Sequence, residues 1–270
     1  MRRNADPTRQ PRALFLVASC LAAALTSSGC LTGPLSEGNA AQPHLDTKVF
    51  QISCEDGRRY AARTLKARNY RITSVDRSGA DTTVGGRNDT DKVTSRLTVT
   101  CGADGVTVSP SGSNQWIIDG LRFGFYQIAD AGDRMWPPPK GPVVKMELYS
   151  GPEAKIEFPS ELEPLGVVAV RVRVINAGER TLRIDPRRLR AVTEAGAPAV
   201  PLGSADAERK LAAIDPDIKS KLLKPTKLKQ GESVIGFVFF PVGSYTGGAL
   251  ALIDDQTGEA DDYDVNFAAS

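Results

Sequence analysis

Few side chains in this chain of 270 residues are suited to catalysis. The only histidine, His44, lies in a segment without apolar periodicity, so the commonest general base and metal ligand is missing from the expected folded parts. The sequence also lacks a G-x-S-x-G elbow, an H-E-x-x-H motif and a G-x-x-x-x-G-K loop. A serine or cysteine triad is therefore not expected. Carboxylates remain as candidate acid and base groups, but no spacing singles out a pair.

Thiol chemistry rests on four cysteines, Cys20, Cys30, Cys54 and Cys101. A metal site would need C-x-x-C spacing or histidine partners, and the chain offers neither. Two expected strands place a cysteine on their apolar face, with Phe50 and Ile52 leading to Cys54, and Leu97 and Val99 leading to Cys101. On neighbouring strands Cys54 and Cys101 could form a disulfide, which would stabilise a small domain by about 4 kcal/mol.

The N-terminal residues have the composition of an export signal. Four arginines precede an uncharged, largely apolar run from Ala13 to Leu25, and small residues follow up to Cys30. This order is typical of a cleaved signal peptide. The apolar run is shorter than the ~20 residues that a membrane-spanning helix needs, and no later segment is long and apolar enough. The sequence therefore predicts an exported protein rather than a spanning one.

The run Thr26-Ser27-Ser28-Gly29-Cys30 resembles the lipobox of bacterial lipoproteins. In that family the cysteine thiol is acylated and becomes the new N-terminus, so the resemblance implies a signal peptide over residues 1–29 and lipid on Cys30. Ser27 stands where a typical lipobox has an aliphatic residue. Two alternatives therefore stay open, lipidation at Cys20 after Val17-Ala18-Ser19 and cleavage without lipid. Leu31 after the cysteine, rather than Asp, indicates sorting to the outer membrane, facing the periplasm or the cell surface.

Removal of the signal changes the cysteine and charge counts. With Cys20 gone and Cys30 acylated, Cys54 and Cys101 remain as an even pair in a compartment that permits disulfides. Cleavage also removes four arginines and one aspartate, which leaves 30 basic and 31 acidic residues in a mature chain of 241 residues. The mature protein thus has no overall basicity that would favour nucleic acid.

The expected fold class is mainly β with an α+β part. The expected organisation is a signal peptide (1–29), a lipidated tether (30–46), a small α+β domain (47–112), an aromatic and Pro-rich connector (113–142) and an Ig-like β-sandwich (143–270). The small domain is expected in the order β-α-β-β-β, with its helix over 58–69 and a hairpin turn at Ala103-Asp104-Gly105. The connector is expected to contain aromatic strands over 116–128 and a stiff extended spacer over 136–142.

Three basic residues, Arg59, Arg63 and Lys66, form a stripe along the expected helix. We interpret this basic stripe as a solvated face, and the alternative is a site for anionic lipid, nucleic acid or an acidic partner. Five lysines between Lys219 and Lys229 are likewise interpreted as a solvated helix end. The acidic segment from Asp254 to Asp264 is interpreted as a solvated hairpin turn, with a hard cation as the alternative.

The strand pattern of the C-terminal half is the clearest in the chain. Val168 to Val174 alternate as a half-buried strand whose outer face carries Arg171 and Arg173. The motif V-x-V-x-V-x-N at 170–176, followed by G-E-x-x-x-G-x-x-x-F-P at 231–241, resembles Ig-like β-sandwich domains of exported bacterial proteins. That resemblance implies an antiparallel sandwich without assigned catalytic residues.

The expected strand over 233–240 is apolar on both faces, and a helical insertion over 204–224 precedes it. We expect the insertion to cover one face of the strand. If it does not, the candidate partner surface is the exposed face around Val234, Val238 and Phe240.

These features predict a non-enzymatic lipoprotein of the bacterial cell envelope that is tethered to a membrane and acts by binding. The expected partner is another envelope or surface protein, which would bind at the sheet edges or at the apolar face. No cofactor, metal or nucleic acid is expected. Two alternatives remain, a carboxylate-dependent hydrolase of glycan or peptide and a purely structural spacer. A close, buried Asp/Glu pair in a cleft would favour the hydrolase.

Overall fold

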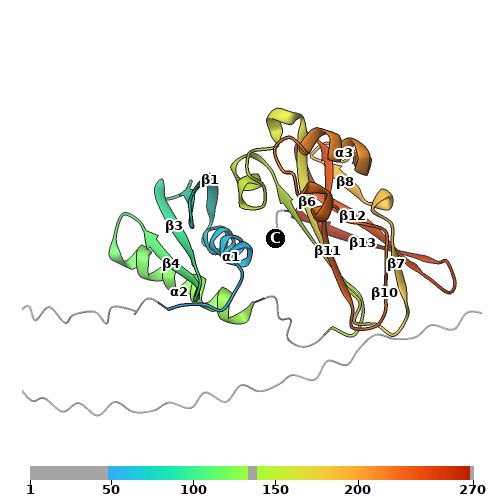
Figure 1. Cartoon of the computed structure of the whole chain (residues 1–270), viewed down its shortest axis with the longest axis horizontal. Helices are drawn as coiled ribbons and strands as arrows, with labels where there is room; N and C mark the ends of the chain where they lie inside the picture. Colours follow the sequence, from blue (N-terminus) through green and yellow to red (C-terminus); the bar gives the residue numbers. More distant parts are fainter. Residues whose placement is uncertain (1–47, 133–138, 268–270) are drawn as a thin grey trace, which may run out of the picture. The chain divides into compact units, whose positions relative to one another are not determined.

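A four-stranded antiparallel meander forms the first part of the structure (Figure 1). The computed structural model describes residues 48–132 and 139–267. The strands are β1 (Tyr70–Ser78), β2 (Asp81–Asn88), β3 (Val93–Gly102) and β4 (Gly105–Ser111), paired in chain order. The expected turn at Ala103-Asp104-Gly105 joins β3 to β4. The helices α1 (Cys54–Lys66) and α2 (Gln115–Ala131) pack on this sheet.

The helix α1 begins at Cys54, earlier than the helix expected over 58–69. Its N-terminus is capped because Ser53 Oγ accepts a hydrogen bond from the Asp56 N–H at 3.0 Å. Cys54 is therefore a helical residue, and its expected position on a strand is wrong. Its Cα nevertheless lies 5.7 Å from that of Cys101, which is disulfide distance.

The segment that was expected to form aromatic strands is the helix α2, so that expectation is wrong. Asn114 Oδ1 caps this helix by accepting from the Ile117 N–H at 2.9 Å. Leu121, Phe125 and Ala129 recur every four residues on the face buried against α1 and β4. This helical period, rather than the alternation of the aromatic residues, determines the local structure.

The expected β-α-β-β-β order is also wrong. Residues 48–53 were expected to form a strand, but they make only a single β-bridge, between Phe50 and Val106. The observed order is a helix, four strands and a second helix. The domain boundaries at 112 and 143 stay a prediction.

The second part of the structure, from β5 to β13, is an antiparallel β-sandwich. Together with the meander and its two helices, it confirms the predicted mainly β fold with an α+β part. The three-stranded sheet has the order β11 (Ser233–Pro241), β6 (Val167–Ile175) and β5 (Val143–Tyr149). The six-stranded sheet contains β10 (Thr226–Leu228), β7 (Leu182–Ile184), β12 (Tyr245–Asp254), β8 (Arg190–Thr193), β9 (Pro198–Ala199) and β13 (Ala260–Asn266). Both β7 and β8 pair with one edge of β12, and β13 pairs with its other edge.

The three-stranded sheet is buried on both faces. Val170, Val172 and Phe240 pack in the core between the two sheets. On the opposite face, Phe237 and Phe239 belong to a second apolar cluster, which also contains residues of the inserted helices α3 (Ser204–Leu211) and α4 (Ile218–Lys221). The insertion therefore covers one face of β11, as expected.

Gly236 of β11 lies against the end of the inserted segment. The Leu223 N–H donates to the Phe237 carbonyl at 2.9 Å, and a Cβ at position 236 would lie 2.6 Å from the Leu223 Cα. Because the clash is with backbone, we expect Gly236→Ala to lower the free energy of unfolding by about 2 kcal/mol in urea titrations. In the control Gly141→Ala, a Cβ would meet nothing within 4 Å. Equal stability of the two variants would contradict this packing.

Candidate functional site

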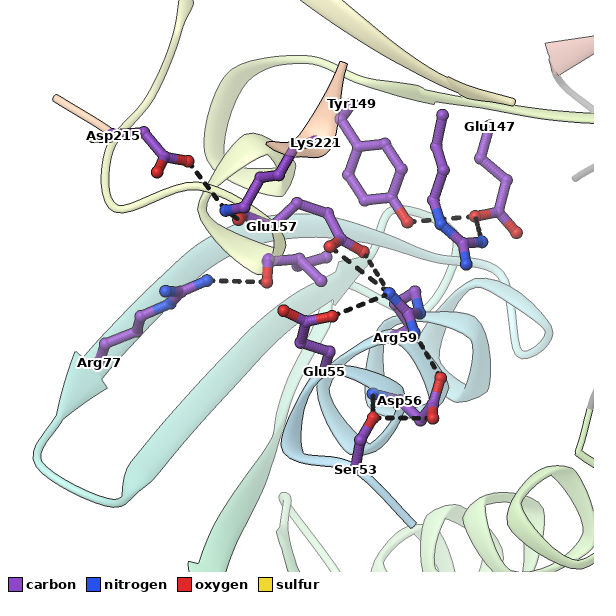
Figure 2. A network of polar contacts seen from close by, with 12 residues as sticks. Ser53, Glu55, Asp56, Arg59, Arg77, Glu147, Tyr149, Glu157, Asp215 and Lys221 are labelled. Carbon is purple, nitrogen blue, oxygen red and sulfur yellow. Dashed lines mark hydrogen bonds and ion pairs between the residues drawn. The ribbon is translucent and has the colours of Figure 1, made fainter. Parts of the chain in front are cut away.

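The basic stripe of α1 forms ion pairs with acidic side chains between residues 147 and 157. Figure 2 shows one of these pairs, Arg59 with Glu157. Arg59 pairs with Glu157 at 3.1 Å, Lys66 pairs with Glu153 at 2.7 Å, and Arg63 pairs with Glu147. Glu147 belongs to β5, Glu153 to the 3-10 helix η1 (Gly151–Ile156), and Glu157 follows η1 directly. The interpretation of the stripe as a solvated face is therefore wrong, because its partners are acids of the same chain.

The Arg59–Glu157 pair is the most buried contact of the stripe. The Glu157 side chain is 4% exposed and that of Arg59 is 11% exposed. Burial alone would lower the pKa of Arg59, but Glu157 and Asp56 raise it, so the net shift is upward. The guanidinium therefore stays charged and offsets the buried Glu157 carboxylate.

Glu147 is the centre of a second group of contacts, and it accepts hydrogen bonds from three side chains. Arg171, only 5% exposed, donates at 3.3 Å, the Tyr149 hydroxyl donates at 3.1 Å, and Arg63 donates to the other oxygen. Burial alone would raise the pKa of Glu147, but Arg63, Arg171 and Tyr149 together lower it. Burial, followed by the charge of Glu147, raises the pKa of Tyr149, which stays a proton donor. The expected charged outer face of β6 is thus wrong at Arg171, which is buried and paired.

Two cations donate hydrogen bonds to the backbone at the end of η1. Lys221 Nζ donates to the Glu157 carbonyl at 2.9 Å and to Asp215 Oδ2 at 2.8 Å, and Asp215 is 4% exposed. Arg77 of β1 donates to the Ile156 carbonyl at 2.7 Å. Lys221 is therefore not part of a solvated helix end, and the segment around Glu157 is held from the meander and from the insertion.

A hollow of about 510 Å³ lies beside the Arg63–Glu147 pair, between β5 and β13. It is lined by residues 144–147 of β5, residues 264–266 of β13 and Arg63 of α1. Within the described residues, β5 pairs only with β6, and β13 pairs only with β12. Each strand therefore has one edge without a strand partner among the described residues, and residues of both strands line the hollow.

The charges around the hollow are of both signs. Glu147 and Arg63 neutralise each other, as described above. Lys145 and Asp264 also line the hollow, and in the part of the chain that the structure describes neither has an ion-pair partner. One cation and one anion are thus available to a partner at this hollow.

The outer edge of β11 differs from that of β5 because its carbonyl groups already have partners. The Leu202 N–H donates to the Phe239 carbonyl at 2.8 Å, and the Leu223 N–H donates to the Phe237 carbonyl. An apolar cavity of about 200 Å³ between these two segments is lined by both phenylalanines.

The side chains of the candidate partner surface do not form an exposed face. Val238 is 5% exposed and Phe240 is fully buried, because both lie in the core between the two sheets, and Val234 packs against that core. A partner surface there would require opening the sandwich, so that expectation is wrong. The candidate lipidation site Cys30 and the histidine His44 lie outside the described residues.

The acidic segment between β12 and β13 is partly neutralised by bases. Arg180 pairs with Asp254 at 3.3 Å and with Asp261 at 3.1 Å, and Lys227 pairs with Asp255 at 2.8 Å. Across residues 48–132 and 139–267, no group of three or more His, Cys, Asp or Glu side chains is arranged to hold a metal ion.

Comparisons with known proteins find little. No family model matches the chain, and no curated protein matches it. Among solved structures, the crystal structure of the yjhA protein from Bacillus subtilis is similar at 15% identity, over 37% of this chain and 73% of that one, with a TM-score of 0.28. This likeness is too low to carry an argument. No helix of the described residues is long and apolar enough to cross a membrane.

Glu147→Gln tests whether the Glu147 carboxylate is ion-paired with Arg63 and Arg171 in the folded protein. The substitution leaves the buried Arg171 without its anion, so we expect the free energy of unfolding at pH 7 to fall by about 3 kcal/mol. The control Asp206→Asn removes one partner of the exposed Asp206–Arg209 pair, whose side chains are 53% and 78% exposed. We expect a change below about 0.5 kcal/mol there.

The pH dependence of stability in Glu147→Gln and in the native chain checks the charge of Glu147. Its folded pKa is below the value of about 4.3 of an unfolded chain, so the ionised group stabilises the fold above that pH. This contribution is lost as the pH falls through the folded pKa. Urea titrations from pH 7 into that acidic range should therefore show a smaller loss of stability in Glu147→Gln than in the native chain. Equal losses would contradict the assignment.

Proposed function

We propose that the protein is an exported lipoprotein of the bacterial cell envelope, anchored through lipid on Cys30, whose folded part binds another envelope or surface protein. The signal-like N-terminus and its resemblance to a lipobox support the anchor. The disulfide distance between Cys54 and Cys101 supports an oxidising compartment, because the bridge would persist there. Sorting to the outer membrane belongs to the same proposal.

The observation that carries the binding role is the hollow between β5 and β13, two strands that each have one edge without a strand partner among the described residues. An extended segment of a partner can add to such an edge through main-chain hydrogen bonds, while side-chain contacts select the partner. Lys145 and Asp264 offer charges of both signs for that selection, and Val144 and Val265 offer apolar contact. The ion-paired network under β5 keeps this edge in place.

The hydrolase alternative receives less support from the same residues. It requires a carboxyl group with a raised pKa as general acid. Glu147, the carboxylate in the hollow that comes from β5, instead has a lowered pKa and is paired with Arg63 and Arg171. We therefore propose no enzymatic activity.

Position-specific photo-crosslinking in intact cells tests the binding site. A photoreactive residue in place of Lys145 should form a discrete adduct with one envelope protein. The matched control carries the same residue in place of Lys219, a lysine of α4 that is 74% exposed and lies outside the hollow. Because Asp264 lines the same hollow as Lys145, Asp264→Lys should reduce the adduct at 145 by charge reversal.

Two outcomes contradict the proposal. Equal adducts at positions 145 and 219 would show random proximity, and no adduct at 145 would remove the hollow as the binding site. The anchor is checked separately by mass spectrometry of the mature N-terminus, where an unmodified Cys30 would refute lipidation without bearing on the hollow.

A further inference from the structure

The outer face of α2 carries two exposed aromatic side chains. Trp116 is 81% exposed and Phe123 is 55% exposed. They are seven residues apart, about two helical turns, so they lie on one face, opposite the buried Leu121 and Phe125. Among the described residues, the other large apolar side chains that are exposed are all aliphatic. Two exposed aromatic side chains on one helix face mark a candidate interaction surface.

A cation lies beside this pair. Gly120 is on the same helix face, between the two aromatics, and a Cβ there would be 2.9 Å from the Nη1 atom of Arg68, which follows the C-cap of α1. The absence of a side chain at 120 lets the guanidinium rest against α2. In the part of the chain that the structure describes, this guanidinium has no ion-pair partner. The acids of α2 are neutralised nearby, Asp119 by Arg122 at 3.5 Å and Asp130 by Lys48 at 2.7 Å.

The chain leading from the proposed anchor arrives at this helix. Lys48, the first described residue, pairs with Asp130 near the end of α2, and its N–H donates to the Tyr126 hydroxyl at 3.3 Å. Seventeen residues separate Cys30 from Lys48, a length that can span at most about 60 Å. A membrane that holds the lipid is therefore within reach of the whole helix, which is about 25 Å long.

We infer that the face of α2 formed by Trp116, Phe123 and Arg68 docks on the phospholipid surface to which the chain is tethered. Tryptophan at the level of the head groups presents an apolar ring and a polar N–H to the two environments found there. Phe123 adds apolar contact, and the Arg68 guanidinium pairs with a lipid phosphate. This contact would hold the tethered protein at the surface and orient it. The inference rests on the proposed anchor.

Fluorescence of Trp116 in reconstituted vesicles tests the docking. The chain has two tryptophans, so Trp136→Phe leaves Trp116 as the only one. The full lipoprotein is purified from membranes in detergent and reconstituted into phosphatidylcholine vesicles with or without brominated acyl chains. We expect the emission of Trp116 to be quenched by the brominated lipid and shifted to shorter wavelength. Arg68→Glu should reduce the quenching.

A matched control moves the tryptophan to the sandwich. It combines Trp116→Phe and Trp136→Phe with Val242→Trp, at a position that is 53% exposed. Quenching of Trp116 no stronger than that of this control would overturn the inference. Protection of Trp116 that depends on protein concentration rather than on lipid would also overturn it, by assigning the face to a second copy.

Flotation of the same vesicles separates this test from that of the anchor. Protein that floats with lipid on Cys30 but shows unquenched Trp116 refutes the docking alone. Protein without lipid on Cys30 refutes the anchor, and the quenching measured after adding vesicles to that protein still decides whether α2 binds the lipid surface.

Discussion

The ion pairs between the basic stripe of α1 and the acids of β5 and η1 are the interaction on which the rest of the described structure depends. Burying a carboxylate or a guanidinium is costly unless each has a partner. Arg59 with Glu157, and Arg63 and Arg171 with Glu147, meet that requirement with donors from both parts of the chain. An apolar cluster surrounds these contacts and includes residues of α1, of the meander and of the outer face of the three-stranded sheet. Loss of one charge would leave its partner buried and unpaired, so the network favours one arrangement.

This constraint also explains how the structure can present a binding edge. A free β-strand edge is useful to a partner only if the strand holds its position. The Glu147 side chain ties β5 to Arg63 and Arg171, while the backbone of β5 pairs, among the described residues, with β6 alone. The hollow at the edges of β5 and β13 is thus backed by contacts that reach α1. The aromatic face of α2 belongs to the same first part, so a protein docked there would keep the sandwich in a fixed orientation to the lipid surface.

Local patterns were sufficient to predict much of the fold from the sequence. Alternation from Val168 to Val174 predicted β6, and the Asp104-Gly105 turn predicted the hairpin of β3 and β4. The two apolar faces of β11 predicted that the insertion covers one of them. The failures have physical causes. Aromatic alternation over 116–128 predicts strands, but Leu121, Phe125 and Ala129 have helical spacing and form the buried face of α2. The pattern Ser53-x-x-Asp56 is a capping signal that marks the start of α1. The partners of the basic stripe could not be predicted, because Glu147, Glu153 and Glu157 come near it only through tertiary packing.

A double-mutant cycle on Arg59 and Glu157 tests the central claim most directly. The free energies of unfolding of the native chain, Arg59→Met, Glu157→Gln and the double variant are measured by urea titration under one set of conditions. If the buried pair joins the two parts, each single variant leaves the other charge unpaired, and the coupling energy should be about 2 kcal/mol or more. Additive effects, within about 0.5 kcal/mol, would contradict the claim that this interaction holds α1 on the sandwich.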